Sequence, residues 1–272
     1  MMMVQRLHYH LREVEPYINW LYFYHAWGLT GKPELERQTL HDEALHLLHQ
    51  ADGVCMTHAA FGLFDAYSDG DDLIAGDVRL PMLRQQKPGA DGYCHCLADY
   101  VRPRSAGEPD KLGLFATTVD VRLQERHADD PYLTMLSQTL ADRLAEATAE
   151  KLHEEVRRTY WGYAPDEHLS IEELHREAFQ GIRPAVGYPS LPDTSINFLI
   201  DRLIGMTDIG IRLTEHGAMR PHASVSGLML SHPAARYFDL GPIGIDQLSD
   251  YARRRGIPLP LMRKFISSNI ER

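Results

Sequence analysis

The chain has 272 residues, of which 44% are hydrophobic and 24% charged, and its formal net charge at pH 7 is −10. This length is enough to bury a sizeable core, and the composition is ordinary for a globular protein. The acidic balance argues against a broad nucleic-acid interface, and no segment reaches the roughly 18 apolar residues that a membrane span needs.

The first 55 residues or so are expected to form a helical part, and residues 56–272 an α+β body of the same single domain. Residues 13–29 are rich in aromatic side chains, Pro33 interrupts the pattern, and residues 35–52 carry apolar side chains at helical spacing. The chain begins without the apolar segment of a signal peptide, so we expect a cytoplasmic protein.

The three cysteines indicate reduced thiols rather than a metal site. They form no C-x-x-C pair, which fits the cytoplasm. Cys94, His95 and Cys96 lie in residues 92–103, for which we predict a strand. Since neighbouring residues of a strand point to opposite faces, His95 would face away from both sulfurs, and packed cysteines are favoured over metal ligands.

The middle of the chain has the alternation and turn residues of a sheet. Residues 59–67 and 71–78 predict a β-hairpin that turns at residues 68–70, Ser-Asp-Gly. The acidic residues around this turn miss the ligand spacing of a calcium loop. Residues 111–121 predict a further strand, so this part of the chain should supply the core of the sheet.

The strongest helix is predicted over residues 132–158, where apolar side chains recur every three or four positions. Asp142 and Glu146 lie one turn apart on another face of this helix. Like charges at this spacing destabilise an isolated helix by about 0.2–0.5 kcal/mol. The pair is therefore either a solvated face or a carboxylate pair that binds a cation.

The last third mixes short helices with short strands. Ser170 begins a capping box for a helix that we expect to end near Gly181. Further helices are predicted over residues 195–206, 246–256 and 260–271, and further strands over residues 211–215, 224–231 and 235–241. Helices that surround mostly antiparallel strands, with no βαβ rhythm, predict an α+β fold with a twisted antiparallel sheet.

Residues 181–195, GIRPAVGYPSLPDTS, place one arginine in a loop stiffened by prolines. The guanidinium of Arg183 can bind a carboxylate through two parallel hydrogen bonds. Gly187 permits close approach of a ligand to the backbone, and Tyr188 and Tyr237 offer aromatic faces to an adenine ring or a sulfonium. The loop is either a structural crossing or a site for an amino acid or nucleoside.

Several longer stretches occur together in one order: residues 140–167, 172–193, 223–238 and 246–256, with Tyr-Ile-Asn-Trp at 17–20 and Cys-Leu-Ala-Asp-Tyr at 96–100. In combination they resemble the activation domain of cobalamin-dependent methionine synthase, the part of that enzyme that binds S-adenosylmethionine. The resemblance covers nearly the whole chain and rests on several independent motifs.

The resemblance implies a set of ligand-binding residues. Arg183 would bind the carboxylate of S-adenosylmethionine, and the backbone of three loop residues would line the ligand: Ala185, Gly187 and Tyr188. Two carboxylates and an aromatic pair match further contacts: Glu146, Glu177, Tyr237 and Phe238. Asp142 matches a residue implicated in receiving the histidine of the cobalamin domain once that histidine leaves cobalt.

The chain departs from the family pattern at several positions. Asn19 stands where the family has an aspartate that helps to hold the ligand's ammonium group, so binding would be weaker or would depend more on Glu146. The segment at residues 193–195 is shorter than usual. Arg220 and His222 replace a more usual tryptophan and glycine, which bears on the surface that meets the cobalamin module.

The implied reaction is the regeneration of methylcobalamin. Cob(II)alamin takes an electron, commonly from flavodoxin, and the resulting cob(I)alamin attacks the methyl group of S-adenosylmethionine. Such a nucleophile needs no general base, so the activation domain's contribution to this methyltransferase is to position the methyl group.

The chain lacks two features of the complete enzyme, the D-x-H-x-x-G cobalt-binding motif and a cysteine cluster for zinc. We therefore expect a free-standing activation subunit that works with a separate cobalamin-bearing methionine synthase chain and a flavodoxin-like electron donor. Two alternatives are a reactivator of another corrinoid methyltransferase and a non-catalytic regulator that binds S-adenosylmethionine.

Overall fold

The computed structural model describes residues 4–270, and its main sheet is organised by one long strand, β2. β1 and β3 pair with the two ends of β2, β5 pairs along its other edge, and all pairings are antiparallel. The order is β4-β3-β2-β5-β8, with β1 beside β2, and β6 and β7 form a separate ribbon. The strands are β1 (Gln5–His10), β2 (Met56–Asp69), β3 (Asp72–Ala75), β4 (Val78–Pro81), β5 (Asp110–Val119), β6 (Arg212–Leu213), β7 (Met219–Arg220) and β8 (Ser224–Met229).

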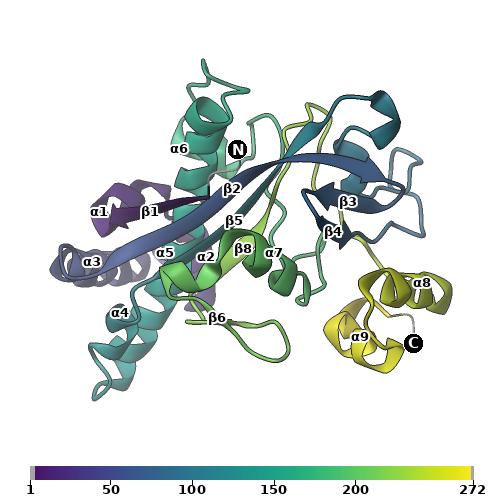
Figure 1. Ribbon diagram of the computed structural model, residues 1–272. Helices are drawn as coiled ribbons and strands as arrows, with labels where there is room; N and C mark the ends of the chain where they lie inside the picture. The colour runs from purple at the N-terminus through teal and green to yellow at the C-terminus, as the bar shows by residue number, and fades with distance from the viewer. Residues whose placement is uncertain (1–3, 271–272) are drawn as a thin grey trace.

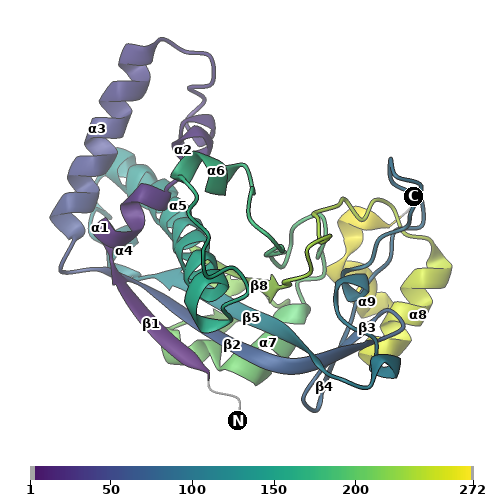
Figure 2. The same ribbon diagram turned by 90° about the horizontal axis from the view of Figure 1, so that it is seen from above.

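Helices cover both faces of this curved sheet. α5 crosses one face, where it packs on β2, β5 and β8, and α7 packs on the other, while α8 and α9 lie at the β3–β4 end (Figures 1 and 2). The helices are α1 (Leu11–Val14), α2 (Trp20–Ala26), α3 (Glu34–Ala51), α4 (Arg122–Glu125), α5 (Pro131–Glu155), α6 (Ile171–His175), α7 (Ile196–Ile204), α8 (Ile245–Arg255) and α9 (Leu259–Phe265). A π-helical turn, Val156–Tyr160, extends α5, and short 3₁₀ turns lie at Glu15–Tyr17, Leu97–Tyr100, Arg104–Ala106, Met206–Ile209 and Ser267–Asn269.

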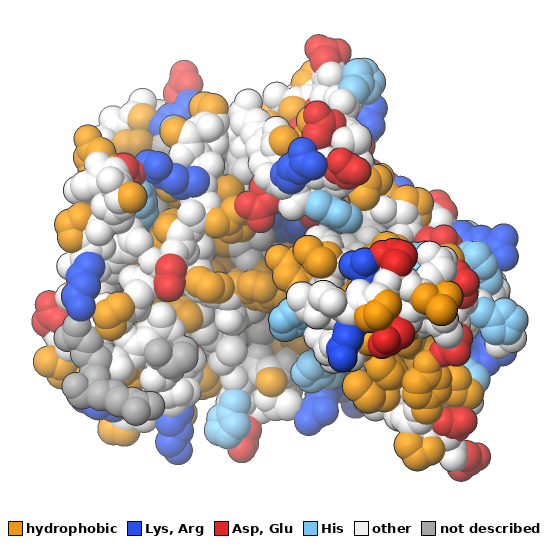
Figure 3. All heavy atoms as spheres, turned by 180° about the vertical axis from the view of Figure 1, so that it is seen from behind, with side chains coloured by type: hydrophobic (Ala, Val, Ile, Leu, Met, Phe, Trp, Pro, Cys, Tyr) orange, Lys and Arg blue, Asp and Glu red, His pale blue; other side chains and the backbone are white. Residues whose placement is uncertain are grey.

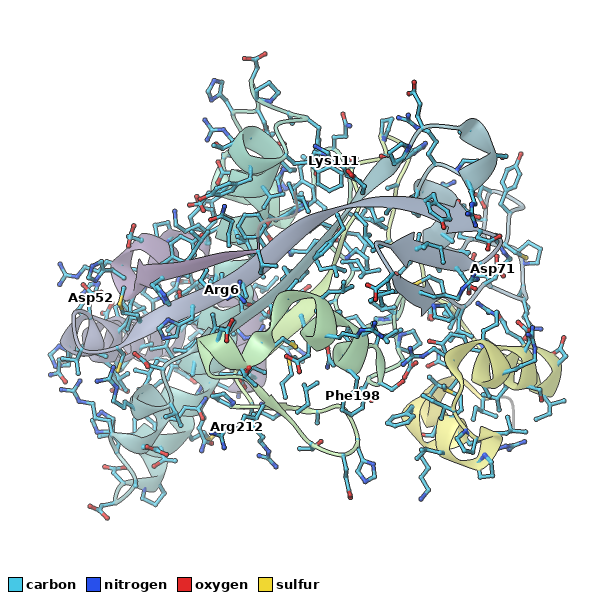
Figure 4. All side chains as sticks on the ribbon, in the orientation of Figure 1. Arg6, Asp52, Asp71, Lys111, Phe198 and Arg212 are labelled. Atoms are coloured by element: carbon cyan, nitrogen blue, oxygen red, sulfur yellow. The ribbon has the colours of Figure 1, made fainter. Side chains whose placement is uncertain are left out.

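Successive side chains of the strands point to opposite faces of the sheet, and this divides the hydrophobic core into two main layers. Ala59 and Phe61 of β2 pack with α1, α3 and α5 on one face, whereas Ala60 and Phe64 pack with α7 on the other. A third, smaller cluster joins α8 and α9. Arg6, which is labelled in Figure 4, connects β1 to the end of α7. Its Nη2 donates a hydrogen bond to the carbonyl of Ile204 at 2.9 Å.

The structure confirms the predicted α+β fold with a mostly antiparallel sheet surrounded by helices. The hairpin is confirmed too, since β2 and β3 are in register at Asp69 and Asp72. Helices occupy most of residues 11–51 as expected, but β1, which was not predicted, precedes them. Residues 1–3 and 271–272 of the predicted domain lie outside the described residues, and within residues 4–270 no helix is both long and apolar enough to cross a membrane.

Two predicted strands are wrong. Residues 92–103 contain a 3₁₀ turn instead, because Asp99 accepts a hydrogen bond from the backbone of Cys96 at 2.9 Å and caps that turn. The alternating-face interpretation of the two cysteines therefore does not apply. Residues 235–241 form an irregular segment whose backbone is held by side chains. The capping box at Ser170 is confirmed, but α6 ends at His175, earlier than expected.

Candidate functional site

The loop at residues 182–191 is held against β8 as an irregular extra strand. Ile182 and Leu230 exchange two backbone hydrogen bonds of 2.9 and 3.0 Å, and Val186 N donates to the carbonyl of Ser226 at 2.8 Å. This pairing places the loop along the β8 edge of the sheet, where its side chains contact α5. The position of Arg183 is therefore fixed by main-chain contacts on both sides of it.

Two glycines make this close approach possible. A Cβ atom on Gly227 would lie 2.2 Å from the carbonyl oxygen of Pro184 and 2.9 Å from Cα of Ala185, so β8 can meet the loop only without a side chain there. Gly187 has φ +90°, in the left-handed region, and its N–H donates to the carbonyl of Leu191 at 2.8 Å. The predicted ligand-lining backbone at residues 185–188 is thus a tight turn.

The side chain of Arg183 is hydrogen-bonded to two residues of α5. Its Nη2 and Nη1 donate to the two carboxylate oxygens of Glu150 at 2.7 and 3.3 Å, and Nη1 also donates to Nδ1 of His153 at 3.0 Å. The Arg183 side chain is 15% exposed and that of Glu150 12%. Burial opposes the charge of Arg183, but the attraction of Glu150 prevails and raises the pKa of the guanidinium. Glu150 and His153 were not predicted as site residues, although they lie one and two turns after Glu146 on the same helix.

A cavity of about 230 Å³ lies beside this loop, and Asp142, Glu146 and Tyr188 all line it. The hydroxyl of Tyr188 donates to Glu146 at 2.8 Å, and Arg143 donates to the same carboxylate at 2.7 Å. Burial, followed by the nearby Glu146, raises the pKa of Tyr188 to about 12. The two acidic side chains predicted one turn apart are therefore part of a pocket wall, in which Glu146 already has two partners.

The outer edge of the cavity is formed by Asp142 and His222. Nδ1 of His222 lies 3.5 Å from a carboxylate oxygen of Asp142, and the His222 side chain is 84% exposed. We call these two residues the rim. Figure 3 shows the side of the molecule that faces away from the viewer in Figure 1. The surface there is hollowed between two raised parts, with charged and apolar side chains at the edges.

Of the other predicted ligand-binding residues, Tyr237 contacts Arg183, Glu177 lies near it, and Phe238 packs elsewhere. Tyr237 accepts a hydrogen bond from the backbone N–H of Arg183 at 2.9 Å. Glu177 has a positive φ of 57°, and burial raises the pKa of its carboxyl, although the charge of Arg183 acts to lower it. Phe238 is placed differently: its ring packs with the second and third core clusters, and its backbone is held by Ser190.

Asn19 is the N-cap of α2. Its side-chain oxygen accepts a hydrogen bond from the backbone N–H of Leu21 at 3.2 Å, which satisfies one of the free donors at the start of the helix. Tyr22, on the first turn of α2, lies near enough to Tyr188 to raise the pKa of that phenol slightly. Asn19 therefore has a structural role, as the cap of α2, that the sequence pattern did not indicate.

A second buried layer lies behind Arg183. Arg157 is fully buried, donates to Glu167 at 2.6 Å and stacks over the ring of Phe179 at 4.2 Å. The ring of His153 contacts the same phenylalanine, with 5.0 Å between ring centroids. Charged side chains and one histidine thus connect α5 to the segment that leads into the loop.

Comparisons with known proteins agree with the resemblance seen in the sequence. The family model for the vitamin B12 dependent methionine synthase activation domain matches residues 10–256. A crystal structure of the MetH reactivation domain bound to AdoHcy is similar to this chain with a TM-score of 0.93 and 36% sequence identity. The alignment covers 99% of this chain and 91% of that chain.

Proposed function

Since the chain belongs to the activation-domain family of vitamin B12-dependent methionine synthases, we propose that it binds S-adenosylmethionine between α5 and residues 183–188. The observation that carries the proposal is Arg183, an arginine held in one orientation by Glu150, in the loop whose Val186 and Tyr188 line a cavity together with Glu146. The relative with a TM-score of 0.93 was solved with AdoHcy, the demethylated form of this ligand.

In this proposal the chain binds and orients its ligand. Arg183 takes the α-carboxylate, and Glu146, Glu177 and Asn19 surround the ammonium group. The backbone of residues 185–188 and the ring of Tyr237 border the nucleoside. Because the sulfonium is an excellent leaving group, the methyl group needs correct placement and the exclusion of competing orientations rather than a general base.

We further propose that the methyl group is delivered to a partner. Cobalamin, carried by a separate methionine synthase chain and reduced by a flavodoxin-like donor, supplies the nucleophile. Asp142 at the rim would receive the histidine that leaves cobalt. On this proposal the protein is a cytoplasmic activation subunit and the methyltransferase reaction requires both chains.

A second candidate is a regulator that binds S-adenosylmethionine without methyl transfer, or a reactivator of another corrinoid methyltransferase. The contact between His222 and Asp142 favours the regulator, because the carboxylate that would receive a partner's histidine already faces a histidine within the chain.

The test begins with calorimetry of S-adenosylmethionine binding to the whole chain. The protein is then mixed with a cob(II)alamin-loaded methionine synthase chain, a reductant and methyl-labelled S-adenosylmethionine. Label on cobalt supports the proposal. Binding without labelled cobalt favours the regulator, and an absence of binding overturns the proposed ligand. If cobalt is labelled only when another corrinoid protein replaces the methionine synthase chain, the other reactivator is favoured.

A further inference from the structure

Arg183 uses only part of its hydrogen-bonding capacity within the protein. An arginine side chain carries five N–H groups in one plane. Two Nη1 hydrogens are used by Glu150 and His153, and one Nη2 hydrogen by Glu150. The N–H of Nε and the second N–H of Nη2 remain, and these two point in the same direction along one edge of the plane.

That remaining edge is not fully closed off from solvent. Nε of Arg183 makes no hydrogen bond to any of residues 4–270. It is nevertheless not fully buried, since it is absent from the buried side-chain nitrogens that lack a partner. It therefore keeps some contact with solvent. The side of the guanidinium toward α5 is occupied, while the Nε–Nη2 edge is the side from which a ligand can approach.

We propose that Glu150 and His153 are positioning residues, which hold one side of the Arg183 guanidinium and so direct its Nε–Nη2 edge to the carboxylate of the ligand. The inference rests on the proposed function and adds to it that Glu150 stays bound to Arg183 when the ligand binds. The ligand adds two hydrogen bonds to the arginine and displaces none.

His153 is suited to this role as a neutral imidazole. Arginine can only donate, so Nδ1 of His153 must accept, and the ring proton must be on Nε2. Burial lowers the pKa of His153 well below its usual value, and the charges of Arg183 and Arg157 lower it further. A protonated ring would donate from both nitrogens and would push Arg183 away.

The charge of the site restricts the class of ligand. Glu150 already balances Arg183, Arg143 balances Glu146, and the carboxyl of Glu177 lies near Arg183 as well. A simple anion would bring its carboxylate into a site with no spare positive charge. A ligand with an amino-acid end brings an ammonium group together with its carboxylate, so the arrangement favours a zwitterion.

The test compares two nucleosides, S-adenosylhomocysteine, which carries the amino-acid end, and 5′-methylthioadenosine, which lacks it. Binding is measured by calorimetry to the wild type, His153→Leu and His153→Asn. We expect His153→Leu to weaken S-adenosylhomocysteine by about 3- to 10-fold, the scale of one ordinary hydrogen bond, without changing 5′-methylthioadenosine. His153→Asn, whose Oδ1 can accept in place of Nδ1, should stay within about twofold of the wild type.

Controls separate this inference from the proposed function. His46→Leu removes a histidine from α3 and should change neither affinity. A crystal structure of the complex should retain the Glu150–Arg183 contact, and this readout does not depend on the stability of the variants. Equal losses for both nucleosides, or a Glu150 that leaves Arg183 in the complex, would overturn the inference. A wild type that binds neither nucleoside would overturn the proposed function itself.

Discussion

Residues 182–190 and the rim formed by Asp142 and His222 border the same cavity, but the fold holds them very differently. The loop is paired with β8, and its arginine is 15% exposed and bound to Glu150 and His153. At the rim one 3.5 Å contact joins side chains that are 37% and 84% exposed. The fold therefore preorganises the loop, to which we assign the small ligand, and constrains the rim less, to which we assign the larger partner.

The largest effect should come from the loop side. Arg183→Ala leaves Glu150 buried without its partner, and we expect a loss of about 3–5 kcal/mol in the free energy of unfolding. Urea denaturation measures this loss. The double variant Arg183→Gln with Glu150→Gln removes both charges, so it should recover most of the stability and still fail to bind the carboxylate. If Arg183→Ala alone costs less than 1 kcal/mol, the loop is not held through this pair.

The next prediction concerns the main-chain contact between loop and sheet. Gly227→Ala would place Cβ 2.2 Å from the carbonyl oxygen of Pro184, and a rigid backbone atom cannot move aside as a side chain can. We expect a destabilisation of about 1–3 kcal/mol and weaker ligand binding, measured by denaturation and calorimetry. Gly89→Ala is the control, because its nearest neighbour would be the movable carboxylate of Asp91 at 3.2 Å. Similar effects of the two changes would contradict the assigned role of Gly227.

Asn19 allows the structural and ligand-binding roles to be separated. Asn19→Ala removes the N-cap of α2 and should cost about 1 kcal/mol of stability. Asn19→Asp keeps the cap and adds a negative charge, so it should leave stability nearly unchanged and tighten S-adenosylmethionine binding a few-fold, because hydrogen bonds to charged groups are about twice as strong. An unchanged affinity in Asn19→Asp would place the ammonium group elsewhere.

The sequence predicted the parts of this structure that depend on local pattern. The spacing of Leu136, Leu140 and Leu144 predicted α5, and the Ser-Asp-Gly turn predicted the hairpin. The rigidity of the loop was also expected, but for an incomplete reason. Prolines were expected to stiffen it, whereas the structure also anchors it through backbone pairing with β8, which requires Gly227 far along the chain. Such a non-local contact leaves no periodic signal.

The candidate site shows the same limit. Family resemblance supplied Arg183, Glu146 and Tyr188. The structure places Glu146 and Tyr188 on the wall of one cavity, and Arg183 in the same loop as Tyr188 but bound to Glu150. The resemblance did not supply Glu150 or His153, because residues that hold a binding group from behind look like ordinary members of a helix. The two wrong strands have a related cause: residues 92–103 and 235–241 have apolar side chains at strand-like positions, but side-chain capping and hydrogen bonds to other segments hold their backbones in irregular shapes.

The smallest effect is expected at the rim. His222→Gly removes one exposed contact with Asp142, and such exposed pairs contribute about 0–1 kcal/mol. The free energy of unfolding should therefore change by no more than about 1 kcal/mol, and the affinity for S-adenosylmethionine should stay within about twofold of the wild type. Thermal unfolding and calorimetry check this. The variant becomes informative when a cobalamin-bearing chain is added, because a free Asp142 should then change the affinity for that partner more than the affinity for the small ligand. If His222→Gly weakened the small ligand as much as His153→Leu does, the rim would belong to the ligand site, and the distinction between a fixed loop and an adaptable edge would be lost.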